Sequence, residues 1–156
     1  ILYIMKYNTI LILLLAILLY FINQIYTNDK SNYSNYSNDE LNYIHNELID
    51  IFKRLKFVLE KHKIKYWAMS GTLLGTIRNN KIIQYDDDMD LGMLKEDFLK
   101  LKNDKEVHKD LDRMGIYLKT NAHLKIMKKR YDKYFTNKIF IDIFCLELKD
   151  EYYVLS

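Results

Sequence analysis

Residues 66–93 read YWAMSGTLLGTIRNNKIIQYDDDMDLGM, and this stretch decides how the rest of the chain is interpreted. It contains three of the chain's four glycines together with four aspartates. Residues 66–69 are an aromatic and apolar run, which predicts a short buried strand. Ser70 and Gly71 end that strand, and residues 72–78 predict a short helix that begins at this turn.

A helix that begins at a Ser-Gly turn presents free backbone N–H groups and the positive end of its dipole. Both features suit a bound phosphate group. We therefore predict that Ser70, Gly71 and the N–H group of Thr72 bind substrate phosphates. Arg78 is predicted to add positive charge for a diphosphate.

The second half of the stretch is acidic. Asp86, Asp88 and Asp90 alternate with other residues, so at the period of a strand they share one face. Carboxylates two residues apart lie roughly 6 to 7 Å from each other, and burying an unpaired one is costly. Mg²⁺ removes that cost, because it prefers one or two carboxylates together with substrate phosphates. An exposed acidic loop that meets no metal is the alternative, and the phosphate-binding turn before it favours the metal site.

A second informative stretch is KIFIDIFCL, residues 138–146. Asp142 interrupts a run of apolar and aromatic residues with high strand propensity. An aspartate between Ile141 and Ile143 should not be buried without a partner. We predict that it meets Asp88 and Asp90, the alternative being a strand-end residue that caps a loop. The chain's one cysteine excludes both a disulfide within the chain and a cysteine-based zinc site.

Residues 70–78, Ile82-Ile83 and the run Asp86-Asp87-Asp88-Met89-Asp90 resemble the signature of the LicD family. That family includes the fukutin-related proteins and belongs to the nucleotidyltransferase-fold superfamily. The resemblance covers about residues 41–148. Family members often carry Pro-Trp before the acidic run and His after the Arg, where this chain has Gln84-Tyr85 and Asn79.

The resemblance implies an α/β (α+β) fold, in which helices flank a nucleotidyltransferase-like mixed sheet. An Asp-x-Asp pair on one strand and a third carboxylate on a later strand meet in this superfamily, and Asp142 matches the third carboxylate. The implied catalytic and metal-binding residues are Asp88, Asp90 and Asp142. The implied substrate-binding residues are Ser70, Gly71, Thr72, Arg78 and Asp86, the last being either a further ligand or a residue that positions ligands.

The implied reaction is a metal-dependent phosphotransfer with Mg²⁺ or Mn²⁺ as cofactor. A phospho-linked small group, of the phosphocholine or phospho-alditol type, would move from a CDP-type donor to a glycan hydroxyl. Two cations about 3.5 to 4 Å apart would stabilise both the entering and the leaving oxygen. The alternatives are a catalytically silent, membrane-anchored binding or scaffold domain and a true nucleotidyltransferase. A formal net charge of +3 gives no argument for nucleic acid as a partner.

Residues 9–26 predict a single-pass transmembrane helix, within an N-terminal signal anchor of residues 1–27. The apolar run is shorter than the roughly 20 residues that a span needs, but tyrosines flank it as interfacial residues do. Lys6 precedes the run, and no Ala-x-Ala-like cleavage site follows it. A cleaved signal peptide and a buried core helix are the alternatives.

Residues 28–38 predict a flexible linker between the anchor and a domain of residues 39–156. The linker contains Asn-Tyr-Ser twice, at residues 32–34 and 35–37. Both copies are N-glycosylation acceptors if the domain faces the secretory lumen, and simple abundance of asparagine is the alternative. We expect a lumenal catalytic domain of the endoplasmic reticulum or Golgi type.

The remaining elements are predicted from periodicity. Residues 39–62 predict a helix, with His45 and His62 off its apolar stripe and therefore solvated. Residues 95–114 predict a second helix that Gly115 ends, followed by strands at 116–120 and 124–127. Lys128-Lys129-Arg130 predicts a solvated turn or a phosphate contact. The apolar stripe of the first helix is Leu41, Ile44, Leu48, Ile51, Leu55, Val58 and Leu59.

Overall fold

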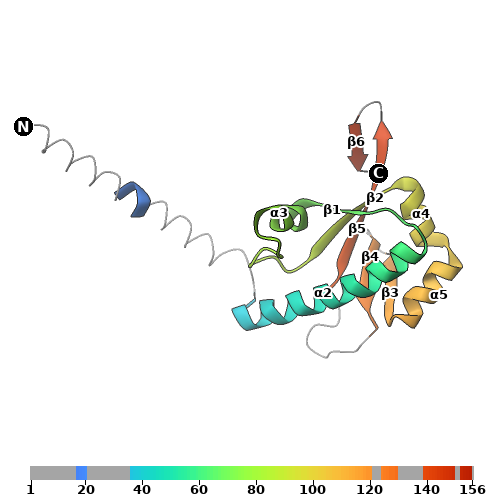
Figure 1. Cartoon of the computed structure of the whole chain (residues 1–156), viewed down its shortest axis with the longest axis horizontal. Helices are drawn as coiled ribbons and strands as arrows, with labels where there is room; N and C mark the ends of the chain where they lie inside the picture. The colour runs from blue at the N-terminus through green and yellow to red at the C-terminus, as the bar shows by residue number, and fades with distance from the viewer. Residues whose placement is uncertain (1–16, 21–35, 121–123, 130–138, 150–151, 156) are drawn as a thin grey trace, which may run out of the picture. The chain divides into compact units, whose positions relative to one another are not determined.

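The computed structural model describes residues 17–20, 36–120, 124–129, 139–149 and 152–155 (Figure 1). The chain divides into two compact units, Ile1–Tyr36 and Ser37–Ser156. Of the first unit the structure describes only Tyr36 and one exposed helical turn at residues 17–20. The second unit contains the mixed sheet and the helices that flank it.

The predicted transmembrane helix at residues 9–26 lies outside the described residues except for the turn at 17–20. Within the described ranges, no helix is both long enough and apolar enough to cross a membrane. The signal anchor, most of the linker at residues 28–38 and the lumenal location therefore stay predictions.

The second unit is built on a six-stranded mixed sheet with the order β1-β2-β5-β4-β3, in which β6 also pairs with β5. Strands β2 and β5 are parallel, and the other pairs are antiparallel. The predicted mixed sheet is thereby confirmed. The strands are β1 Trp67–Ala68, β2 Met89–Leu94, β3 Ile116–Thr120, β4 Leu124–Lys128, β5 Ile141–Lys149 and β6 Tyr152–Leu155.

Helix α2, Asn38–Lys61, covers one face of the sheet, where it contacts β3, β4 and β5 (Figure 1). Ser37 and Glu40 form a capping box at its start, which satisfies two backbone N–H groups that the first turn leaves free. The seven residues of the predicted apolar stripe are its buried residues. This helix and its inward face are therefore confirmed.

The single helix predicted at residues 95–114 is wrong, because two helices stand there. Helix α4 spans Lys95–Asn103 and helix α5 spans Lys105–Arg113. Asp104 between them has an extended backbone, and its carboxylate accepts hydrogen bonds from the N–H groups of Glu106 and Val107. Asp104 therefore starts a new helix as an N-cap. Gly115 ends α5 at a φ of +71°, as predicted.

His62 is not the solvated residue that the sequence predicted. Its ring Nε2 lies 2.8 Å from the Oδ2 atom of Asp110, a buried residue of α5. Lys61 Nζ donates to the same oxygen at 2.6 Å, and Arg113 donates to Asp110 Oδ1 at 3.0 Å. These donors, Lys61 before His62, hold the pKa of Asp110 well below its usual range. Asp110 thus joins the end of α2 to α5 as an anion.

Lys128 fits neither interpretation of the basic cluster. Its ammonium group is mostly buried and lies 2.8 Å from Glu47 and 2.7 Å from Asp50, both on α2. It therefore fastens β4 to the covering helix. Lys129 pairs with Asp112 of α5, and residue 130 lies outside the described residues.

The burial of α2 predicts unequal effects for two neighbouring substitutions. Leu48 is 0% exposed and Ile49 is 40% exposed. Leu48→Ala should lower the free energy of unfolding by about 2 to 5 kcal/mol, because it removes buried methyl groups and leaves a cavity. Ile49→Ala, the matched control, should change it by less than about 1 kcal/mol. Urea unfolding followed by circular dichroism measures both, and equal losses would contradict this packing.

Candidate active site

The register of three strands brings acidic and basic residues into one row. In the parallel pair β2–β5, Asp90 lies opposite Asp142, and in the antiparallel pair β4–β5, Lys125 lies opposite the same Asp142. Asp88, just before β2, adds a third carboxylate. Oxygen atoms from Asp88, Asp90 and Asp142 all lie within 4.8 Å of one another. The predicted convergence of these three residues is confirmed, whereas their roles as ligands and catalysts stay predictions.

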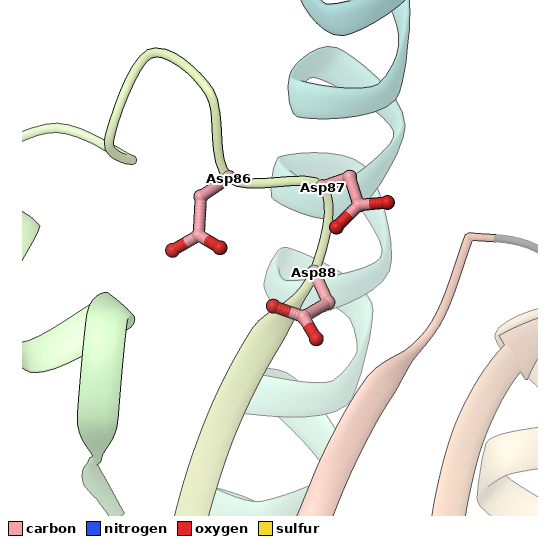
Figure 2. A group of neighbouring side chains, drawn as sticks. All are labelled: Asp86, Asp87 and Asp88. Carbon is pink, nitrogen blue, oxygen red and sulfur yellow. The ribbon is translucent and has the colours of Figure 1, made fainter. Parts of the chain in front are cut away.

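Asp86, Asp87 and Asp88 form a loop rather than the predicted strand, because β2 begins only at Met89. Figure 2 shows the carboxylates of Asp86 and Asp87 to either side of this loop and Asp88 where the chain enters β2. One oxygen from each of the three also lies within 4.8 Å of the others, although Asp87 is exposed. The strand predicted at Asp86 is therefore wrong, although the Asp86 carboxylate does lie close to that of Asp88.

His45 of α2 forms a hydrogen bond with the acidic loop, residues 86–88. Its ring Nε2 donates to the backbone oxygen of Asp86 at 2.7 Å. His45 is therefore half-buried and bonded, against the prediction of a solvated side chain. Sequence reasoning missed it because a histidine off an apolar stripe has no local signal for a partner 41 residues away.

Helix α3, Ser70–Asn79, begins beside the carboxylates as predicted. Ser70 adopts a φ of +47°, which turns the chain out of β1 into the helix. A Cβ atom on Gly71 would collide with Asp86 Oδ2, so glycine lets that carboxylate approach the first turn. The Thr72 hydroxyl accepts a hydrogen bond from the Asp90 N–H at 2.8 Å, and this bond holds α3 against β2.

Arg78 lies away from this turn. It is exposed in the last turn of α3, about 12 Å along the helix axis from Ser70 at 1.5 Å per residue. Its predicted contact with a diphosphate stays a prediction, as do the phosphate contacts of Ser70, Gly71 and the Thr72 N–H.

The carboxylates of the site are electrostatically crowded. Burial, followed by the charges of Asp88 and Asp90, raises the pKa of Asp86 to about 6. Burial, followed by the charges of Asp88 and Asp142, raises the pKa of Asp90 to about 6, although a hydrogen bond from Ser70 opposes this shift. Burial and the charge of Asp87 raise the pKa of Asp88 as well. The site thus favours either protons or added cations.

One oxygen of Asp142 has no hydrogen-bond partner among the described residues. Asp142 Oδ1 is buried and accepts no hydrogen bond. Lys125 Nζ lies 3.4 Å away, which makes an ion pair without hydrogen-bond geometry. A buried acceptor is rarely left without a partner. Asp88, Asp90 and Asp142 bring their carboxylate oxygens close together, and such oxygens are the hard ligands that Mg²⁺ and Mn²⁺ prefer. The residues present therefore fit a divalent cation.

The comparison with protein families agrees with this arrangement. The family model described as LicD/FKTN/FKRP, nucleotidyltransferase domain, matches residues 63–155. The chain belongs to this family. The matched residues include α3, the acidic loop, β2 and β5, which together carry the site.

Individual proteins match shorter stretches of the chain. An uncharacterised protein of Rickettsia prowazekii is 35% identical over 82 residues, which are 53% of this chain and 30% of that protein. The ribitol 5-phosphate transferase FKRP of Homo sapiens is 48% identical over 40 residues, which are 26% of this chain and 8% of FKRP. The chain thus spans less than a third of the length of these relatives.

Among solved structures, ANT(2")-Ia in complex with adenylyl-2"-tobramycin is similar, with 13% sequence identity and a TM-score of 0.43. The match covers 67% of this chain and 53% of that one. A likeness this low carries no conclusion about either fold or function.

The raised pKa of Asp90 predicts how stability depends on pH without metal. Its folded-state pKa of about 6 exceeds the unfolded value of about 3.9. The contribution of Asp90 to the free energy of unfolding is therefore fully present below pH ~3.9 and is lost as the pH rises through about 6. In the presence of a chelator, Asp90→Asn should raise the melting temperature at pH 7.5, and it should raise it much less at pH 4.5. Thermal unfolding by circular dichroism measures this, and an Asn variant that is less stable than the wild type at pH 7.5 would contradict it.

Two glycines of α3 predict different consequences of an added methyl group. In Gly71→Ala the methyl group meets only the tip of the Asp86 side chain, so the fold should remain and Asp86 should be displaced. In Gly75→Ala it meets the backbone oxygen of Lys81, which should lower the free energy of unfolding by about 1 to 3 kcal/mol. Urea unfolding separates the variants, and Mn²⁺ binding to Gly71→Ala reports the displaced carboxylate. A Gly71→Ala protein as unstable as Gly75→Ala would disprove this geometry.

Proposed function

We propose that this chain is a metal-dependent phosphotransferase, which moves a phospho-linked small group from a nucleotide-diphosphate donor to a glycan hydroxyl. The convergence of Asp88, Asp90 and Asp142 beside the start of α3 is the observation that carries this proposal. Family membership and the human relative named as a ribitol 5-phosphate transferase support the class of reaction. A CDP-type donor of phosphocholine or a phospho-alditol is the finer part of the proposal.

In this proposal Asp88, Asp90 and Asp142 hold Mg²⁺ or Mn²⁺. A bound ion supplies positive charge that offsets the repulsion between the carboxylates and stabilises charge on the phosphate under attack. Asp142 stands beside Lys125 at the far side of the row from α3, and it completes the site near the attacking hydroxyl. Asp86 positions the loop against Gly71.

The first turn of α3 binds the donor phosphates. Its backbone N–H groups are free of side-chain caps, because Met69 at the N-cap position makes no such bond. The dipole of a ten-residue helix adds partial positive charge at this end. The Thr72 hydroxyl is already bonded to the Asp90 N–H, so Thr72 links the phosphate-binding turn to a metal-binding carboxylate.

The reaction is tested by incubating the purified chain with CDP-choline or CDP-ribitol, Mg²⁺ and a glycan acceptor. Transfer of the phospho-linked group releases CMP, which chromatography quantifies. Asp90→Asn keeps the side-chain shape but removes a charged ligand, so it should lower CMP release by about 100-fold or more. Asp112→Asn, which makes the same charge change at an exposed position on α5, is the matched control and should leave the rate unchanged.

Three outcomes would refute this function. One is release of pyrophosphate in place of CMP, which indicates nucleotidyl transfer. The others are turnover that persists in a chelator and turnover that survives in Asp90→Asn. A chain that binds the metal but releases no nucleotide from any donor would favour the silent binding domain.

A further inference from the structure

Lys125 places an ammonium group among the carboxylates of the candidate site. It lies opposite Asp142 on β4, and Asp142 lies opposite Asp90 on β2, so the three form one row across the sheet. Its neighbours Leu124 and Ile126 are buried, and the period of a strand sends Lys125 to the other face. The side chain is only 25% exposed, and its Nζ lies 3.4 Å from Asp142 Oδ1. Lys125 therefore belongs to the site and not to the solvated surface.

The ammonium group is held in place from a second side. Lys125 Nζ lies 3.2 Å from the centroid of the Phe140 ring, an arrangement that a cation favours most when it is shielded from water. Phe140 precedes Asp142 by two residues, which puts both on the same side of an extended chain. A lysine fixed between an aromatic face and a carboxylate acts as a stationary charge.

The charge of Lys125 reaches the whole cluster. Its Nζ contacts Asp142, one oxygen of which lies within 4.8 Å of oxygens of Asp88 and Asp90. A second divalent cation bound to Asp142 would approach Oδ1, which lies 3.4 Å from the Lys125 ammonium group, and the two cations would repel each other.

We propose that Lys125 takes the place of a second metal ion, so that the site binds one divalent cation beside a fixed ammonium group. This assignment rests on the proposed function, because it concerns the same three carboxylates. It replaces the two-cation arrangement that the sequence suggested. In it the ammonium group lies beside Asp142, at the end of the row away from α3.

The test is Mn²⁺ binding to the full chain, followed by electron paramagnetic resonance without any donor. The wild type should bind Mn²⁺ with the spectrum of a single ion. Lys125→Met removes the charge and keeps a side chain of similar length, so it should admit a second ion and give the spectrum of an exchange-coupled pair. Lys125→Arg, which keeps the charge, should retain the single-ion spectrum. Circular dichroism checks that each variant folds.

A coupled pair in the wild type would overturn the role of Lys125 while leaving the proposed phosphotransfer intact, and this result needs no variant. A single ion of unchanged affinity in a folded Lys125→Met protein would overturn it as well. A wild type that binds no Mn²⁺ would overturn the metal site of the proposed function, and the role of Lys125 with it.

Discussion

The parallel pairing of β2 with β5 is the constraint on which the site depends. Its register sets Asp90 directly opposite Asp142, and like charges in that position destabilise a sheet. The opposite face of the same strands offsets this, because Met89, Leu91, Met93, Ile141 and Ile143 are all buried there. Hydrophobic burial on one face therefore forces carboxylates together on the other.

The elements around this pair hold the acidic residues in position. The Thr72 hydroxyl joins α3 to the Asp90 backbone, and His45 joins α2 to the Asp86 backbone. Gly71 leaves room for the Asp86 carboxylate beside the first turn of α3. These contacts come from α2 and α3, and each of them uses the backbone or the space around a carboxylate. Repulsion between these carboxylates lowers the stability of the fold, and the surrounding contacts hold the carboxylates in place. Local violations of this kind are expected at functional sites.

Local errors in the sequence prediction have local causes. The pattern of residues 95–114 predicted one continuous helix, but the helix breaks at Asp104, which is the N-cap of a second helix. The alternation of Asp86, Asp88 and Asp90 suggested a longer strand, yet the turn bond from the Asp86 N–H to the Ile83 oxygen keeps residues 86–88 out of β2. In the first place two hydrogen bonds to the Asp104 carboxylate outweighed the repeating pattern, and in the second a backbone turn bond did so.

The sequence by itself determined the family, the covering helix with its buried stripe, a helix that begins at the Ser70-Gly71 turn and the three converging aspartates. These features depend on periodicity, on glycine and on a motif within a short stretch. Such signals can be recognised in the sequence without knowing which distant residues they contact. Only the tertiary structure decided which cations lie near the anions: Lys125 beside Asp142, Lys128 of β4 beside Asp50 of α2, and the donors around Asp110. Charged side chains reach partners on distant strands and helices, and strand register, which arises from packing across the whole sheet, selects those partners.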